Sequence, residues 1–380
     1  MRAATYGLLS TYPPTECGLA TFTAALRTHL AGPAADPQAV GVVRVVDRLG
    51  SGPSRPEVVQ DLVKGSSSSR RAAAAALNGF DVAIVQHEYG IFGGPDGAEV
   101  LELLDKVTVP TIVVLHTVLV NPSPHQRQIL ERVVGQADAV VTMTRTAHRR
   151  LRSYEVDMTK ASVIPHGAHV PERLVAPRYD AQRPTILTWG LLGPGKGIEW
   201  AIAALALLGH VRPAPRYLVL GKTHPKVLEH QGETYREELA AQAGELGVSE
   251  LVEFDSAYRT VAELEAVIRD ADLILLPYDS PDQVTSGVLI EAVAAGKPVI
   301  SSRFPHAVEL LSDGVGLLVP HRNPEAIAGA LEQVLTDPAL KARMAAGAAR
   351  LAPQLGWPAV AGQYRELGAR MIESRVTNVA

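Results

Sequence analysis

Cysteine is almost absent from the sequence. Cys17 is the single cysteine among 380 residues, so the chain cannot form a disulfide within itself. Such a composition is typical of a reducing compartment. No histidine stands at a spacing from Cys17 that indicates a pair of nucleophile and base, and we expect a small loop residue there rather than a catalytic thiol.

Long hydrophobic runs are absent too, although 47% of the residues are hydrophobic. The apolar stretch within residues 1–10 is soon followed by Pro13 and Pro14, and it is too short for a signal peptide or a membrane-spanning helix. We expect a first buried strand there. The expected location is the cytoplasm, and peripheral contact with the inner face of a membrane through one helix face stays open.

Neither sign of charge is in large excess. Lys and Arg number 36, Asp and Glu number 40, and the formal net charge is −4. Because the basic residues occur in short, scattered groups, nucleic acid is not an expected partner. We also expect no metal site, since no motif of spaced ligands supports one.

Short apolar runs alternate with helical patterns along the whole sequence, which is typical of parallel sheets built from βαβ units. The length suits two domains of ordinary size. We therefore predict an α/β fold with two doubly wound parallel sheets. The predicted strands are residues 3–9, 40–45, 82–85, 111–115, 139–142 and 162–164, and then 185–189, 217–220, 251–254, 273–276, 299–301 and 316–319.

A proline-rich shift in composition at residues 171–184 predicts a linker between a domain of residues 1–170 and a domain of residues 185–355. Residues 356–380 follow as a terminal helix, with apolar positions at spacings of three and four. The serine run at residues 64–69 is predicted to be a mobile loop. Doubly wound folds bind ligands at the carboxyl ends of their strands, so the polar loops there are the candidate sites.

The stretch of residues 282–300 reads as a polar loop, a helix and a strand, and it follows an apolar strand. Thr285 and Ser286 are good N-cap residues, and Gly287 adds no side-chain bulk. The first N–H groups of this helix would therefore lie open to an anion such as a phosphate.

Gln283 and Glu291 bracket that turn, which places an amide and a carboxylate at one pocket. A carboxylate can accept two hydrogen bonds from a vicinal diol such as that of ribose. The alternative for Glu291 is an ordinary buried carboxylate in an α/β sheet.

A glycine-rich loop at residues 188–197 also follows a strand and opens a helix. Its glycines, Gly190 and Gly195 among them, let the backbone approach an anion closely, and Lys196 adds a positive charge. Lys222, after the next predicted strand, is the candidate for a second cation. A solvated residue at a helix start is the alternative for Lys196.

The first half of the chain offers polar groups at its own strand ends. His116 ends a predicted strand and could hydrogen-bond a sugar hydroxyl, or it could be a core histidine. His87, Glu88 and Tyr89 end another strand, and Arg145 opens a helix after a third.

The loop after the first strand leads into the first helix. Gly18 would allow a tight turn there, and Thr21 could cap the helix or contact a ligand.

These motifs resemble those of the family 4 retaining glycosyltransferases. Glu291 matches the second Glu of the family's Glu-Xaa7-Glu motif, and the Gly-Lys-Pro-Val-Ile strand after it keeps the family frame. Lys196 matches the lysine of the glycine-rich loop. Two positions depart from the pattern, because Gln283 stands in place of the first Glu and Leu191 in place of an Arg.

The resemblance implies a GT-B architecture, in which two Rossmann-like domains face a cleft and a C-terminal helix crosses back to the N-terminal domain. The first domain would hold the acceptor and the second the nucleotide-sugar donor. The resemblance assigns catalytic roles to His116, Lys196 and Gln283. The implied donor-binding residues are Gly18, Thr21, Gly190, Gly195, Lys222, Thr285, Ser286, Gly287, Val288 and Glu291, and the implied acceptor-binding residues are His87, Glu88, Tyr89 and Arg145.

The implied reaction moves a hexosyl group, with retention, from a nucleoside-diphosphate sugar to an acceptor hydroxyl without a metal or other cofactor. Likeness to a mannosyltransferase subgroup favours GDP-mannose over UDP sugars, and the acceptor is a saccharide, a cyclitol or a lipid-linked molecule. Two alternatives remain because of Gln283 and Leu191. One is a pseudo-glycosyltransferase or sugar-nucleotide epimerase on the same fold, and the other is a catalytically silent nucleotide-sugar-binding subunit.

Overall fold

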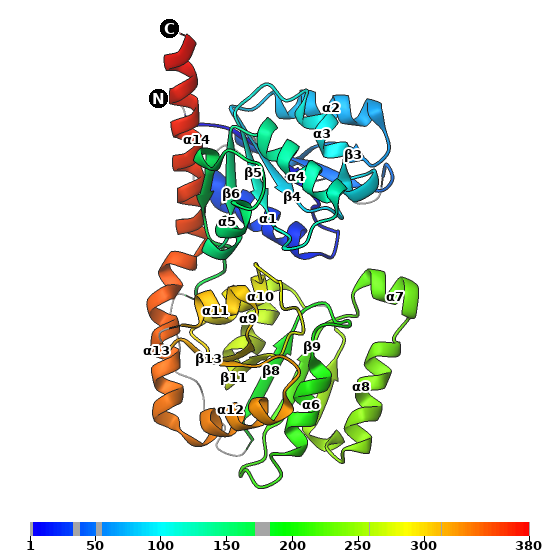
Figure 1. Cartoon of the computed structure of the whole chain (residues 1–380), viewed down its shortest axis with the longest axis vertical. Coiled ribbons are helices and arrows are strands. Elements are labelled where there is room, and N and C mark those ends of the chain that lie inside the picture. Colours follow the sequence, from blue (N-terminus) through cyan, green and yellow to red (C-terminus); the bar gives the residue numbers. More distant parts are fainter. Residues whose placement is uncertain are drawn as a thin grey trace. The chain divides into compact units, whose positions relative to one another are not determined.

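The computed structural model describes residues 3–32, 39–50, 55–171, 183–257, 259–312 and 314–379. The chain divides into two compact units (Figure 1). Unit 1 contains Met1–Gly167 together with Trp357–Ala380, and unit 2 contains Ala168–Gly356. The predicted linker, residues 171–184, lies almost entirely outside the described residues, because 172–182 are not among them.

Unit 1 is built on a seven-stranded sheet in the order β3-β2-β1-β4-β5-β6-β7, with all neighbouring strands parallel. The order reverses between β1 and β4, which makes the sheet doubly wound. The strands are β1 (Tyr6–Ser10), β2 (Val40–Val46), β3 (Val58–Val63), β4 (Val82–His87), β5 (Thr111–Leu115), β6 (Ala139–Thr142) and β7 (Ala161–Val163).

Helices connect these strands, as parallel pairing requires. They are α1 (Gly18–Ala31), α2 (Ser67–Leu77), α3 (Glu99–Leu104), α4 (Pro124–Gln136), α5 (Arg145–Leu151) and α14 (Trp357–Val379), with short 3-10 turns η2 (Pro95–Gly97) and η3 (Met158–Lys160).

The last helix of the chain, α14, belongs to unit 1 and packs beside α1 (Figure 1). Its apolar face includes Trp357 and Tyr364. This face packs into a core that contains Leu8 of β1, Phe22 of α1 and residues of the neighbouring strands. Gly167 lets the chain pass close to this helix, because a Cβ there would lie 2.3 Å from the Trp357 ring.

Unit 2 contains a six-stranded parallel sheet in the order β10-β9-β8-β11-β12-β13. Here the order reverses between β8 and β11. The strands are β8 (Thr185–Trp189), β9 (Arg216–Leu220), β10 (Val252–Asp255), β11 (Leu273–Leu276), β12 (Val299–Ser302) and β13 (Gly316–Val319). The helices are α6 (Ile198–Ala206), α7 (Pro225–Gln231), α8 (Thr234–Glu245), α9 (Val261–Asp270), α10 (Gly287–Ala294), α11 (Pro305–Leu310), α12 (Pro324–Thr336) and α13 (Pro338–Leu355), with the 3-10 turn η4 (Ser249–Leu251).

The predicted fold class, α/β with two doubly wound parallel sheets, is confirmed. The hydrophobic runs indicated the strands because a parallel strand is covered on both faces and reads as a continuous apolar segment. Apart from the short 3-10 turns, one strand and one helix were not predicted. They are β3, an edge strand that contains Gln60 and Asp61, and α7, whose residues are mostly polar.

The prediction of a loop at residues 64–69 was wrong in its second half. Residues Ser67 to Ser69 form the first turn of α2, and the side chain of Ser66 caps this helix by accepting a hydrogen bond from the Ser69 amide. A serine run therefore served as a helix start, since serine is among the best N-cap residues.

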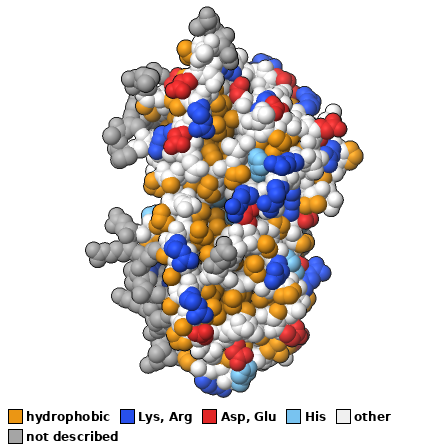
Figure 2. Space-filling model, turned by 60° about the vertical axis from the view of Figure 1, so that its left-hand side comes forward, with side chains coloured by type: hydrophobic (Ala, Val, Ile, Leu, Met, Phe, Trp, Pro, Cys, Tyr) orange, Lys and Arg blue, Asp and Glu red, His pale blue; other side chains and the backbone are white. Residues whose placement is uncertain are grey.

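The face of the molecule in Figure 2 carries Lys and Arg side chains in several small groups, interspersed with acidic and hydrophobic side chains. Among the described helices, including the 23-residue α14, none combines the length and the hydrophobicity that a membrane span requires.

Candidate functional site

The glycine-rich loop after β8 closes against the end of β11. Gly195 and Gly197 have φ angles of 90° and 68°, which favour glycine. A Cβ at Gly197 would lie 2.0 Å from the carbonyl oxygen of Pro277, and the Asp279 amide donates to the Gly195 carbonyl at 2.9 Å. The loops that follow β8 and β11 therefore meet at the point where the strand order reverses.

Lys196 is placed by this loop over an aromatic ring. Its Nζ lies 4.6 Å from the centroid of the Tyr278 ring, which follows β11. Burial lowers the pKa of the Lys196 ammonium. Within the described part of the chain no carboxylate pairs with Lys196. A partly desolvated cation without a counter-charge is a favourable position for a bound anion.

The loops after β8 and β9 also touch. A Cβ at Gly221 would lie 2.0 Å from the carbonyl oxygen of Gly190, and Leu192 forms a parallel bridge with Thr223. The Leu192 amide donates to the Lys222 carbonyl at 2.8 Å. The backbone of Lys222, the predicted second cation, therefore lies beside the glycine-rich loop.

The start of α10 provides open backbone amides. Ser286 caps this helix, and its Oγ accepts a hydrogen bond from the Leu289 amide at 3.2 Å. The amides of Gly287 and Val288 are the first of the helix, so helical geometry gives them no acceptor. Val288 is next to the glycine-rich loop, since its Cγ2 would lie 3.6 Å from a Cβ at Gly190.

The polar residues before this helix lie close to it. The side-chain amide of Gln283 donates to the carbonyl of Thr285 at 2.9 Å. The hydroxyl of Thr285 is buried and has no hydrogen-bond partner among the described residues. The loop thus presents a polar group that is unsatisfied in the protein alone.

Glu291 lies one turn into α10 and faces β8. Its Oε2 accepts a hydrogen bond from the indole N–H of Trp189 at 3.2 Å. Burial raises the pKa of Glu291 to about 7, and the hydrogen bond from Trp189 opposes that rise. This bond engages one carboxylate oxygen, and the other is suited to accept from a ligand hydroxyl.

Unit 2 therefore brings together most of the predicted donor-binding residues at the carboxyl ends of β8 and β11. Three side chains in this group were not predicted, namely Trp189, Tyr278 and His306. Aromatic residues at the last position of a strand or just after it were the available signal for the first two.

Unit 1 has its own polar group at the carboxyl ends of β4 and β5. His116 Nε2 lies 2.7 Å from the Gln86 Oε1, and the Phe22 ring meets His116 edge-on at 5.1 Å. Burial, and then the neighbouring His166 and His87, lower the pKa of His116 to about 3. The imidazole is therefore neutral at physiological pH.

The predicted acceptor residues after β4 differ in how they are engaged. His87 is buried, its Nδ1 has no hydrogen-bond partner among the described residues, and burial lowers its pKa to about 4. The Glu88 carboxylate accepts from the Thr117 hydroxyl and from the Tyr89 amide. The Tyr89 hydroxyl donates to the Gln126 carbonyl at 3.3 Å.

The remaining predicted residues of unit 1 lie at helix starts. Gly18 is the first residue of α1, and a Cβ there would meet nothing within 4 Å. The Thr21 hydroxyl donates to the Cys17 carbonyl at 3.4 Å, while the Cys17 thiol lies 3.2 Å from the Thr11 hydroxyl. Arg145, exposed, is the first residue of α5.

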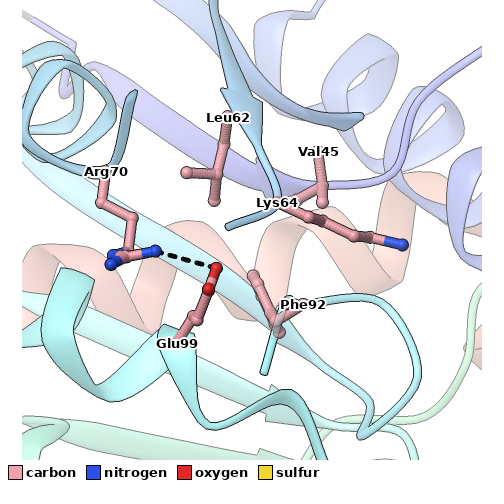
Figure 3. Close-up of a pocket in the computed structure, with 7 residues that line it drawn as sticks. Val45, Leu62, Lys64, Arg70, Phe92 and Glu99 are labelled. Atoms are coloured by element: carbon pink, nitrogen blue, oxygen red, sulfur yellow. Dashed lines mark ion pairs between the residues drawn. The ribbon is translucent and has the colours of Figure 1, made fainter. Parts of the chain in front are cut away.

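A small cavity lies elsewhere in unit 1, between β2, β3, α2 and α3 (Figure 3). Arg70 and Glu99 form an ion pair of 2.9 Å beside it, and Glu99 also accepts from the Gly65 amide at 2.9 Å. The cavity volume of about 10 Å³ leaves room for about one water molecule. This cavity is therefore too small to hold a sugar.

No set of three or more His, Cys, Asp or Glu side chains in the described ranges is grouped to hold a metal ion.

Two family models match the chain in succession. The model described as "Glycosyltransferase Family 4" matches residues 24–170, and the model described as "Glycosyl transferases group 1" matches residues 175–351. The chain belongs to the family 4 glycosyltransferases. The matched ranges correspond to the two sheets described above, so each sheet of this family 4 chain has its counterpart in one of the two models.

Similar proteins include enzymes named D-inositol 3-phosphate glycosyltransferase. The one from Corynebacterium glutamicum (strain R) is 30% identical over 263 residues, which are 65% of this chain and 61% of the relative. The one from Kineococcus radiotolerans is 30% identical over 278 residues, which are 67% and 62% of the two chains. The match thus spans about three fifths of the length of these relatives.

Solved structures share the GT-B fold of this family 4 chain. Sucrose-phosphate synthase from Thermosynechococcus elongatus superposes with a TM-score of 0.78 at 18% identity, covering 97% of this chain and all of the other. HepE from Anabaena, crystallised with UDP, superposes with a TM-score of 0.75 at 18% identity, covering 96% of this chain and all of the other.

Proposed function

We propose that this chain transfers a hexosyl group from a nucleoside-diphosphate sugar to an acceptor hydroxyl, with retention of configuration and without a metal ion. The observation that carries the proposal is the position of Lys196, which has no counter-charge among the described residues and lies next to the loop leading to the open amides of α10. Both features favour an anion at the same strand ends.

A diphosphate is the ligand that these features suit best. Its charge would be stabilised by the Lys196 ammonium and by the amides of Gly287 and Val288, and a helix N-terminus contributes about 0.3–1 kcal/mol per charge. Gly190, Gly195 and Gly197, whose φ angles are positive, leave the loop backbone without a Cβ at these positions, so a phosphate can approach it closely there. These groups can offset the leaving-group charge in place of a metal.

Glu291 is the proposed contact for the ribose. Its second carboxylate oxygen can accept from a ribose hydroxyl, whereas the indole of Trp189 holds the first. Ionised Glu291 accepts these hydrogen bonds better than the protonated form, so donor binding and ionisation of this carboxyl favour each other.

Transfer itself would follow the front-face route that the family resemblance implies. The departing phosphate removes the proton of the acceptor hydroxyl, and neutral His116 and the amide of Gln283 hydrogen-bond hydroxyls of the transferred sugar. A neutral His116 can accept or donate a hydrogen bond without adding charge beside the developing oxocarbenium ion.

The donor and the acceptor are the open choices within this proposal. The sequence favours GDP-mannose, whereas HepE was crystallised with UDP, so both nucleotides belong in the test. Among the saccharide, cyclitol and lipid-linked acceptors, the names of the relatives favour a phosphorylated cyclitol as the first to be tried. His87, Glu88, Tyr89 and Arg145 are the proposed acceptor contacts.

The test is thermal stabilisation of the purified chain by UDP, GDP and their sugars, with the variants Lys196→Ala and Glu291→Ala and the control Lys106→Ala, an exposed lysine of unit 1. A ligand at 100 times its Kd stabilises the native state by about 2.7 kcal/mol. We expect one nucleotide series to raise the midpoint for the wild type and the control, and the two site variants to lose that effect. No shift with any nucleotide would refute the proposal.

One departure from the family motif is compatible with a second function. Gln283 replaces the family's first Glu, and its amide donates within its own loop to Thr285. Three other functions are compatible with Gln283 at this position. The chain could be a pseudo-glycosyltransferase that joins non-sugar cyclitols, an epimerase of the nucleotide sugar, or a subunit that binds a nucleotide sugar without catalysis. Incubation of the bound donor with inositol phosphate and analysis of the anomeric product by NMR separates these cases from retaining transfer.

A further inference from the structure

A histidine outside the matched motifs holds the loop in front of α10. His306 is the second residue of α11 and follows β12, which pairs with β11. The loops after these two strands are therefore neighbours. His306 is 3% exposed and Ser286 is 4% exposed, so their contact is shielded from water.

Two hydrogen bonds join His306 to this loop. The Ser286 amide donates to the Nδ1 of His306 at 2.9 Å. The His306 amide donates in turn to the Gln283 carbonyl at 3.4 Å. A single residue thus holds both ends of the loop of residues 283–286, within which Gln283 also donates to Thr285.

The chemistry of the first bond fixes the state of the ring. A backbone N–H can only donate, so the Nδ1 of His306 must carry a lone pair. The ring is then neutral, with its proton on Nε2.

The bond also fixes the direction of the helix start. Ser286 is the cap residue of α10, with φ −141° and ψ 110°, and its amide lies before the helix, where no helical carbonyl can accept from it. If that amide lost its acceptor in a buried position, the cap would turn to find another. The amides of Gly287 and Val288 and the side chain of Gln283 would turn with it.

We propose that His306 is a positioning residue of the donor site. Through a neutral Nδ1 acceptor it holds the Ser286 cap, and through the cap it aims the first amides of α10 and the Gln283 amide at the donor. It acts through these groups and does not itself touch the donor. The proposal rests on the proposed function, because it takes residues 283–288 to contact a nucleotide sugar.

The first experiment requires no ligand. The full chain is labelled with 15N-histidine, and the signal of His306, one of 12 histidines, is assigned by its loss in His306→Asn. We expect an acceptor-type shift for Nδ1 and a protonated-type shift for Nε2. A protonated Nδ1, or shifts averaged between the two tautomers, would overturn the proposal.

The second experiment compares three variants by calorimetric titration with UDP and GDP. His306→Asn places an amide oxygen near the position of Nδ1, His306→Gln places its amide near Nε2, and His306→Leu removes the acceptor. We expect the Gln and Leu variants to raise the Kd of the bound nucleotide at least tenfold. The Asn variant should stay within about threefold of the wild type.

The outcomes separate the two proposals. Equal weakening in the Asn and Gln variants, or wild-type affinity in the Leu variant, would overturn the role of His306 while the donor site stands. If the wild type binds neither nucleotide, the proposed function fails and the donor-site role of His306 fails with it. If the Leu variant does not fold, the contrast between the Asn and Gln variants decides.

Discussion

Replacement of Glu291 by Gln should remove a pH dependence of stability that the wild type carries. Burial raises the pKa of Glu291 from its ordinary value of 4.5 to about 7. Between these two values the folded chain binds the proton more tightly than the unfolded chain does. The free energy of unfolding therefore falls as pH rises from about 4.5 to about 7. Since one pKa unit is worth about 1.4 kcal/mol, the loss amounts to about 3 kcal/mol.

The assay is urea unfolding of the full chain followed by tryptophan fluorescence at pH 5 and pH 8, with Glu291→Gln beside the wild type. The amide of this variant keeps an oxygen that can accept from the Trp189 indole, and it has no proton to lose. The variant should therefore gain about 2–3 kcal/mol relative to the wild type on going from pH 5 to pH 8. A difference between the two proteins that does not change with pH would refute the reasoning.

Donor binding offers an independent check on the same group. Hydroxyls that donate to the carboxylate favour its ionised form, so the bound state should have a lower Glu291 pKa than the free state. Titration at a pH of about 6.5 in buffers of different ionisation enthalpy should then show proton release by the wild type and none by Glu291→Gln.

Three further predictions concern backbone and positioning residues. Gly197→Ala should destabilise unit 2 by at least about 2 kcal/mol, because this position has a positive φ and no room for a Cβ. It should also weaken nucleotide binding. Thermal melts measure the first effect and calorimetric titration the second. Ser66→Ala should cost about 1 kcal/mol by loss of the α2 cap, without affecting nucleotide affinity. Gln86→Leu leaves the buried Nε2 of His116 without its hydrogen-bond partner, so it should lower the free energy of unfolding by about 1–3 kcal/mol in a denaturation assay. The same variant should reduce kcat more than it changes the Kd of the donor.

Most strands of the two sheets could be predicted from the sequence, because a strand that is buried on both faces is a continuous apolar run. Thr111–Leu115 and Leu273–Leu276, for example, are short apolar runs that were predicted with the bounds they have. The edge strand β3 was missed for the opposite reason, since its Asp61 is polar and pairs with Arg44 of β2 at 2.8 Å. A strand with such a mixed pattern gives no clear hydrophobic signal.

The sequence predicted the candidate site only as a set of separate loops. Glycine, lysine and cap residues indicate an anion site by their types and local order. The side-chain contacts that complete this site could not be predicted in this way. Trp189 and Glu291 are 102 positions apart in the sequence, and Ser286 and His306 are 20 positions apart. Which side chain meets which depends on the strand order of the sheet, and local spacing carries no information about that order.

The place of α14 in unit 1 has a consequence for synthesis of the protein. Phe22 and its neighbours on α1 remain without their cover until Trp357 and the rest of α14 have left the ribosome. All of unit 2 is translated between the first sheet and α14, so unit 2 can be complete before unit 1 is. During that interval the nascent chain carries an exposed apolar helix face, which is a natural binding surface for a chaperone. A premature stop just before residue 357 would leave that face open permanently, and the shortened product should be an early target for proteolysis.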